Sequence, residues 1–402
     1  MNTLSNRAAL LAVLGSTVAA SALFASPAQA QQTCDVTGTG DPATAAGTDA
    51  LACGPRADAN GEGALAVGPD TSAQGNGTLA VGSGTVATGE ETTAVGVRST
   101  ANGLESSAIG YENLADGFGA SAVGGENEAT NQFATASGWA NTASGQNSLA
   151  AGRGNQASGL NSAAIGNQSV ASGTSALAIG DNAQANFSGA TAIGPGARAT
   201  QIRGTAIGSG AAADQDSFAG GTNAIAQGDR TVAIGDNSSA TGTGAAAIGN
   251  LASASGVGSF AGGVRANASG ASSLAIGNRS VASGTSSIAL GDNAQATGEA
   301  SVAAGVGSVA SGEEASALGV RSTALGLEST AAGYENVADG FGASAVGGEN
   351  NATAQFATAT GWANTASGQN SLAAGRGNQA SGLNSAAIGN QSIASALVPL
   401  AM

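Results

Sequence analysis

The sequence predicts an all-β fold, a parallel β-roll solenoid built from 14-residue coils of two short strands each. A closing glycine recurs with a 14-residue period from Gly68 to Gly208, comes one residue early at Gly221, and resumes the same period to Gly389, which gives 24 copies. Alanine holds two fixed positions in every copy, and aromatic residues are only 3% of the chain. A short fixed period indicates stacked units that contact only their neighbours. It overrides the two or three globular domains that 402 residues would ordinarily suggest.

Residues 1–30 have the pattern of a secretory signal peptide. Arg7 supplies the positive start, residues 8–25 are apolar, and residues 28–30 match an A-x-A cleavage site. The alternative is an apolar N-terminal helix of the mature protein. No later run approaches the roughly 20 apolar residues that a membrane-spanning helix needs. We therefore expect an exported chain with no direct membrane span.

Both cysteines, Cys34 and Cys53, lie directly after this segment. In an oxidising compartment they could form a disulfide, and two free thiols are the alternative. A bridge would hold residues 31–54 against the first coil, so we expect these residues to form an N-terminal cap.

Residues 55–395 form the repeats, whose positions we number from 1, directly after one closing glycine, to 14, the next. Positions 5 and 12 are always alanine, position 7 is usually glycine, position 10 is small, and position 13 is mostly Val, Ile or Leu. Glycines this frequent would break a helix, at about 1 kcal/mol each, but suit turns that need a positive φ. We expect two strands of three to five residues per coil, with parallel pairing between coils. Alternation sends positions 10 and 12 to one face and positions 11 and 13 to the other.

The face lined by Ala and Ser predicts packing against other chains, and therefore a homo-oligomer.

Two irregularities interrupt the pattern of the repeats. One residue is missing from the turn within residues 209–221, and Phe218 and Phe260 then occupy position 11, which predicts a local kink or repacking. Residues 98–172 also recur almost verbatim at 321–395. Recent duplication explains this recurrence more simply than two independently selected sites.

The motif Ser-x-Ala-Ile-Gly, followed by x-x-Ser-x-Ala-x-Gly, resembles the head repeats of trimeric autotransporter adhesins, the YadA-like or Hep/Hag repeats. Residues 287–291 and 308–312 carry it, and the likeness covers roughly residues 50–395. The resemblance implies a left-handed parallel β-roll, a homotrimer, export across a Gram-negative inner membrane and a place at the cell surface. It also implies adhesion to a host extracellular-matrix protein or glycan surface. Such adhesins continue into a heptad-repeat stalk and a C-terminal membrane anchor, and we expect this chain, with its tail at 396–402, to lack both.

Catalysis is not expected. The chain has no His, which is the commonest general base, and no nucleophile–base arrangement stands out. The acidic residues fall mostly at turns, where they keep the rod soluble, and the glycine–aspartate nonapeptide of calcium β-rolls is absent. We expect no cofactor and no metal site. A net charge of −15 makes nucleic acid an unsuitable partner.

Aromatic side chains give the best candidates for a binding surface. Four occur within three coils, and the duplicated block repeats them: Tyr111, Phe118, Phe133, Trp139, Tyr334, Phe341, Phe356 and Trp362. Tyr111 and Trp139 share position 1 two coils apart, so we expect them on one edge, about 10 Å from each other. Aromatic residues of this kind suit an interface. They could fill the joint between subunits or contact a ligand, and both readings stay open.

The sequence therefore favours a non-catalytic adhesin head, cell-surface or secreted. The alternative is a structural solenoid that binds ice or an abiotic surface. Such a solenoid needs a flat threonine array, whereas position 11 carries threonine only sporadically. A polysaccharide-acting enzyme would need longer coils and paired carboxylates, which this chain does not offer.

Overall fold

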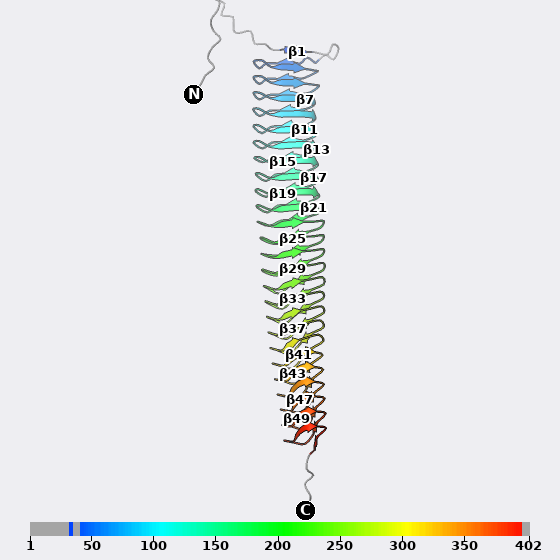
Figure 1. The fold of residues 1–402 in the computed structure, drawn as a ribbon. Coiled ribbons are helices and arrows are strands. Elements are labelled where there is room, and N and C mark those ends of the chain that lie inside the picture. Colours follow the sequence, from blue (N-terminus) through cyan, green and yellow to red (C-terminus); the bar gives the residue numbers. More distant parts are fainter. Residues whose placement is uncertain (1–31, 35–40, 396–402) are drawn as a thin grey trace, which may run out of the picture.

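The structure, a computed structural model, describes residues 32–34 and 41–395, which form an all-β parallel solenoid (Figure 1). Each coil contributes one strand to each of two parallel sheets, and successive coils stack into a rod. The predicted fold class is therefore confirmed. The predicted signal peptide, residues 1–30, and the tail, residues 396–402, lie outside the described residues. Within the described part of the chain, no helix has the length and apolarity to cross a membrane.

The first sheet contains the 26 odd-numbered strands, whose lengths change along the rod in blocks. Three-residue strands open it: β1 (Gln32–Cys34), β3 (Leu51–Cys53) and β5 (Leu65–Val67). The odd strands from β7 (Leu79–Ser83) to β21 (Leu177–Asp181) have five residues, those from β23 (Thr191–Ile193) to β39 (Val302–Ala304) have three, and those from β41 (Ser316–Val320) to β51 (Ala386–Asn390) again have five. The longer strands extend past the closing glycine into position 1.

The second sheet contains the even-numbered strands, which have only two residues each, at positions 4 and 5. It runs from β2 (Thr44–Ala45) to β52 (Ile393–Ala394) with a 14-residue period, which is one residue shorter between β26 (Ala212–Ala213) and β28 (Ile225–Ala226). These strands are shorter than the predicted three to five residues, because the two connections of each coil take up the remaining positions.

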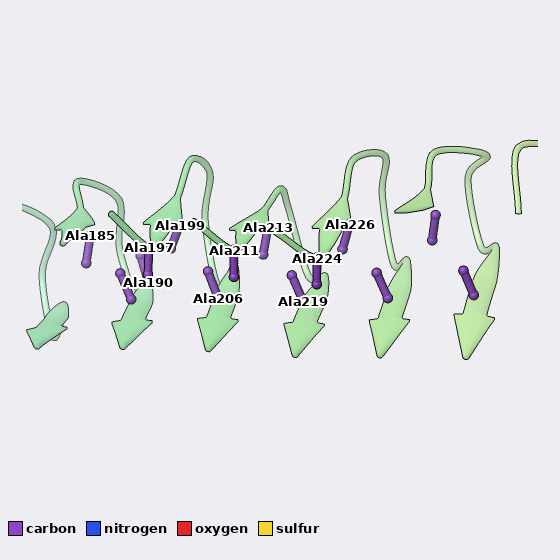
Figure 2. Packing of buried hydrophobic residues seen from close by; sticks show 14 of the residues in the cluster. Ala185, Ala190, Ala197, Ala199, Ala206, Ala211, Ala213, Ala219, Ala224 and Ala226 are labelled. Carbon is purple, nitrogen blue, oxygen red and sulfur yellow. The ribbon is translucent and has the colours of Figure 1, made fainter. Parts of the chain in front are cut away.

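Alanine fills the space between the two sheets. Every alanine at positions 5 and 12 from Ala52 to Ala380 is at most 2% exposed. In Figure 2, Ala206 and Ala219 on strands of the first sheet point toward Ala199 and Ala213 on strands of the second sheet. A larger side chain has no room there, because the facing strand of the same coil occupies the space.

This packing corrects one expectation. The face lined by Ala and Ser does not pack against another chain. It is buried within the coil, because the second strand of the same coil covers it. The predicted alternation of side chains along the strand is confirmed. Positions 10 and 12 point inward, as in Ser162 and Ala164, while positions 11 and 13 point outward, as in Ala163 and Ile165. The side chains at positions 11 and 13 therefore form the outward face of the first sheet.

The coil that is one residue short keeps its strand register. In β27 (Phe218–Gly220), Phe218 pairs with Thr205 on one side and Val232 on the other. The deletion is confined to the connection before β27. Repacking follows at the surface, where a Cβ on Gly220 would lie 2.8 Å from Cε1 of the Phe218 ring. The ring thus covers the place that an outward-facing aliphatic side chain fills in most coils.

Candidate functional site

Tyr111 and Trp139 end two long strands of the first sheet, β11 (Ser107–Tyr111) and β15 (Thr135–Trp139). Between them lies β13 (Ser121–Gly125), and the register places Gly125 in line with both residues. The two rings are within 6° of parallel, and their centroids are 6.3 Å apart. This is closer than the separation of about 10 Å expected from two coils. A Cβ on Gly125 would collide with the indole of Trp139, so the ring leans across the space that glycine leaves.

One charged side chain, that of Arg98, lies against the Tyr111 ring. Nη2 of Arg98 donates a hydrogen bond to the Tyr111 hydroxyl at 2.5 Å, and its guanidinium carbon lies 5.3 Å from the ring centroid. Arg98 also forms an ion pair with Glu112. A cation over a ring face adds an electrostatic attraction to the ring quadrupole. We call Arg98, Tyr111, Glu112 and Trp139 the N-terminal ledge, in which Tyr111 is 37% and Trp139 46% exposed.

The duplicated block repeats the arginine–tyrosine–glutamate contacts and the leaning indole, but within residues 32–34 and 41–395 the stacked tyrosine–tryptophan pair is that of Tyr111 and Trp139. Nη2 of Arg321 donates to the Tyr334 hydroxyl at 2.6 Å, the guanidinium carbon lies 5.4 Å from the ring centroid, and the same arginine pairs with Glu335. The indole of Trp362 leans across Gly348 in the same way. Arg321, Tyr334, Glu335 and Trp362 form the C-terminal ledge, with Tyr334 39% and Trp362 46% exposed.

The four phenylalanines lie on the other connection of the coil. Phe118 and Phe133 follow the short strands β12 (Leu114–Ala115) and β14 (Glu128–Ala129), and their rings meet edge to face at 5.2 Å. Phe341 and Phe356 repeat this contact at 5.0 Å. The aromatic residues expected to cluster in each block therefore form two groups. Positions 1 and 8–9 belong to opposite connections, which sequence proximity does not reveal.

A buried ladder of asparagines at position 3 underlies both ledges, and the sequence analysis missed it. Its members are at most 1% exposed: Asn113, Asn127, Asn141 and Asn155, then Asn336, Asn350, Asn364 and Asn378. Oδ1 of Asn113 accepts hydrogen bonds from both the backbone N and Nδ2 of Asn127, each at 3.0 Å. The same contacts link the following members. A buried amide needs such partners, because an unpaired one costs about 1–3 kcal/mol.

The ladder also changes the shape of the connection that carries the ledges. In coils with three-residue strands the carbonyl of the closing glycine accepts from the backbone of position 3, as Gly194 does from Ala197 at 3.1 Å. In the ladder coils a side chain takes over this carbonyl: Nδ2 of Asn113 donates to Gly124 at 2.8 Å. In these coils the strand continues through position 1. Asn127 binds the carbonyl of Gly138 before Trp139, and the Ser99 hydroxyl donates to the carbonyl of Gly110 before Tyr111, and both aromatic residues lie in sheet register rather than in a turn.

The sequence did contain a signal for this ladder. Asparagine occupies position 3 in four consecutive coils of each block, whereas other coils carry Ala, Ser or Thr there. The 14-residue spacing alone predicts stacked amides. Position 3 lies in a connection whose other residues are exposed turn residues. An asparagine there therefore looks like an ordinary turn residue rather than a buried one.

At the N-terminal end of the described rod, β1 pairs in parallel with β3. The sulfurs of Cys34 and Cys53 are joined in a disulfide, and their Cα atoms are 4.5 Å apart. Next to it, the guanidinium of Arg56 bridges the carboxylates of Asp41 and Asp70. Its hydrogen bonds hold the pKa of the Asp70 carboxyl below its ordinary value.

The described residues show no arrangement suited to catalysis. The shifted carboxyl pKa values belong to Asp70 and Asp216, and in both the main cause is a hydrogen bond from an exposed arginine, Arg56 or Arg203. Within residues 32–34 and 41–395, no group of three or more His, Cys, Asp or Glu residues could hold a metal ion. What the geometry offers instead is a set of exposed side chains repeated in register along a rod.

In a comparison with protein families, one family model matches the chain repeatedly along the rod. The family model described as "YadA head domain repeat (2 copies)" matches residues 59–85, 87–113, 143–169, 171–197, 188–211, 215–238, 240–266, 254–280, 268–294, 282–308, 310–336, 338–364 and 366–392. A comparison with curated proteins gave no match. The family matches include both ledges apart from Trp139, and both asparagine ladders apart from Asn127 and Asn141.

Proposed function

Because this chain belongs to the YadA head domain repeat family, we propose that it is an adhesin head that attaches a cell to a host matrix protein or glycan surface. YadA heads are non-catalytic domains of trimeric autotransporter adhesins, exposed on the outer membrane. The observation that carries the proposal is the unbroken register of the rod, which presents the same positions outward coil after coil. An elongated, repetitive surface of this kind suits multivalent contact with a partner.

The proposal includes a homotrimer, and the outward face of the first sheet supports it. Position 13 places large aliphatic side chains there that are 37–43% exposed: Ile109, Val123, Ile207, Ile234, Ile248, Ile276, Leu290, Leu318 and Val346. A long apolar stripe on one face of a rod marks an interaction surface. Copies of the same chain, which carry the same stripe in the same register, can cover it.

Solution mass tests the trimer directly. Sedimentation equilibrium of the purified chain should give three times the mass of one chain, and a stable monomer at micromolar concentration would contradict the assembly. Replacing Ile248 and Ile276 by Glu should dissociate the trimer, because it buries unpaired charges in the stripe. Leu251→Glu is the matched control: it is similarly exposed but lies in a connection, so the mass should stay trimeric.

Bead adhesion tests the function itself. Beads coated with the purified chain should adhere to immobilised matrix proteins or to cell-surface glycans more than beads coated with albumin. Equal adhesion of both bead types on every surface would count against an adhesin. We further propose that residues 1–30 direct export and that residues 31–54 cap the first coil of the head, residues 55–395. The pairing of β1 with β3 and the disulfide support the cap.

A further inference from the structure

We propose that the two ledges are binding sites for a neutral β-linked polysaccharide, and that one polysaccharide chain can occupy both ledges of a rod. This inference rests on the proposed adhesin function and names the ligand class of a specific surface. It concerns Tyr111 and Trp139 in the N-terminal ledge and Tyr334 and Trp362 in the C-terminal ledge.

The exposed aromatic rings of the ledges have the geometry and polarity that stacking against a sugar ring requires. Tyr111 and Trp139 are exposed at the ends of their strands, and their rings are nearly parallel, at 6°. The face of an aromatic ring is negative, and the axial C–H groups of an equatorially linked pyranose are weakly positive and form a flat apolar patch. Stacking of the two needs an exposed aromatic face, and polar groups beside it can bind the hydroxyls. The Arg98–Glu112 pair supplies donors and acceptors for the sugar hydroxyls at this place.

Charge favours a neutral ligand over a charged polymer. The whole chain carries a net charge of −15, which repels polyanions such as acidic glycosaminoglycans and nucleic acids. Within each ledge the arginine is already paired with a glutamate, so neither sign is in excess. A ligand rich in hydroxyl groups and without charge matches such a surface.

The polar surroundings of the rings argue against a subunit joint. The Tyr111 hydroxyl is bonded to Arg98, and Arg98 is bonded to Glu112, so burial of the ledge would remove two charges from water. The outward stripe of the first sheet already offers apolar surface for the subunits, and although Ile109 shares β11 with Tyr111, the stripe from Ile207 to Leu290 lies in coils between the two ledges. The ledges therefore remain accessible in a trimer whose subunits meet along the coils between them.

The asparagine ladder prepares the ledge for binding. Nδ2 of Asn127 donates to the carbonyl of Gly138, the residue before Trp139, at 2.8 Å. Asn141, two residues after Trp139, donates to the carbonyls of Ser137 and Gly152. The backbone under the indole is thus fixed from both sides by buried side chains. A surface that is already ordered loses less conformational entropy when a ligand binds.

The spacing of the ledges indicates a polymer. Tyr334 is the counterpart of Tyr111 in the duplicated block, sixteen coils further along the rod, with one residue missing in the short coil between them. At about 4.8 Å per coil, the ledges are roughly 77 Å apart along the rod. A short oligosaccharide can reach only one ledge, whereas a long chain can bind both and gain in avidity.

The test compares mixed-linkage β-glucan with cellohexaose on the intact trimer, by biolayer interferometry and by titration of tryptophan fluorescence. We expect the polymer to bind at least tenfold more tightly than the hexamer, and hyaluronan, a polyanion, to bind at least tenfold more weakly than the glucan. Trp139→Ala or Trp362→Ala alone should reduce polymer affinity to that of the hexamer. The double variant should bind neither. Phe133→Asn with Phe356→Asn is the control on the other connection, where Asn147 and Asn161 already occupy the same position, and it should bind like the wild type.

Three results would overturn the proposal: no glucan binding by the wild type, glucan binding that survives in the double tryptophan variant, or loss of the trimer in that variant. Decaproline tests a protein ligand, and tighter binding of decaproline than of glucan by the ledges would also overturn it. Bead adhesion and sedimentation mass separate this failure from that of the proposed function. If both persist without glucan binding, the head remains an adhesin and only the ledge assignment is wrong.

Discussion

The side-chain nitrogen of Asn127 donates a hydrogen bond of 2.8 Å to the carbonyl oxygen of Gly138, one coil further along the rod. Gly138 directly precedes Trp139, so a buried amide fixes the backbone beneath an exposed indole. The same nitrogen donates to Val123 in its own coil at 3.1 Å. The buried interior and the exposed ledge are thus linked through a single residue.

Asn127→Ala should weaken the rod locally. The change leaves the carbonyl of Gly138 without its side-chain donor and the backbone N–H of Asn141 without its acceptor, Oδ1 of Asn127, at a cost of about 1–3 kcal/mol. In a solenoid each coil depends on its neighbours, so the loss should be confined to nearby coils. Hydrogen exchange should show faster exchange in β13, β15 and β17 (Leu149–Arg153). In a Trp362→Phe background, the near-UV circular dichroism of Trp139 should weaken.

Asn147→Gly is the control for this ladder, because Asn147 has a φ of 54°, which glycine adopts without strain. Asn147 is exposed and donates to Asn161 at 3.0 Å on the surface, where water can replace the bond. Its removal should change stability by less than about 0.5 kcal/mol. Equal effects of the two substitutions would mean that the buried ladder has no special role.

Ala164→Leu should be strongly destabilising, and Ala163→Leu should not. Ala164 is 0% exposed between the sheets, so a larger side chain forces the facing strands apart, at about 1–3 kcal/mol or more. Ala163 points outward between Leu149 and Leu177, which already carry the larger side chain in the same register. Urea unfolding midpoints of the two variants compare them directly. A tolerated leucine at Ala164 would contradict the tight interior.

The adjacent glycines Gly124 and Gly125 should respond differently to alanine. Gly124 has a φ of 120°, and a Cβ there would lie 2.9 Å from the carbonyl carbon of Gly138, so Gly124→Ala should cost about 1–3 kcal/mol. The atoms nearest to a Cβ on Gly125 belong to the indole of Trp139, which can swing away. Gly125→Ala should therefore leave the unfolding midpoint nearly unchanged but shift the Trp139 emission spectrum. An unshifted spectrum would show that the ring does not lean across Gly125 in solution.

Acid should remove the contribution of the Arg56–Asp70 pair. Arg56 lowers the pKa of the Asp70 carboxyl in the folded chain, so the stabilisation is present above the unfolded pKa and is lost as the pH falls through the lower folded value. The window therefore lies below about pH 4. The difference in unfolding free energy between wild type and Arg56→Gln should shrink as the pH falls from about 5 to about 2.

Arg279→Gln is the matched control for the pH series, because Arg279 has no ion-pair partner within the described part of the chain. Its difference from wild type should stay constant over the same range. A constant difference for Arg56→Gln would contradict the lowered pKa of Asp70.

The sequence predicted the coil and its interior well, because both depend on local periodicity. Closing glycines with a 14-residue period and alanine at positions 5 and 12 leave few other ways to fold, and the inward face of Ala164 followed from strand alternation. The sequence was less informative about the partner of that face. Strand alternation says that Ser162 and Ala164 point to the same side, but it does not say whether that side meets another chain or the second strand of the same coil.

The sequence alone therefore determined the fold class, the coil length, the buried alanines and the aromatic residues worth attention, since each leaves a periodic or compositional trace. Only the tertiary structure decided that Tyr111 and Trp139 form one ledge while Phe118 and Phe133 lie on the opposite connection. It alone revealed that Gly125 makes room for the Trp139 indole and that a buried amide of Asn127 holds the backbone below it. These relationships join residues in different coils, and they arise from close packing and hydrogen bonding between coils rather than from the local preferences of the chain.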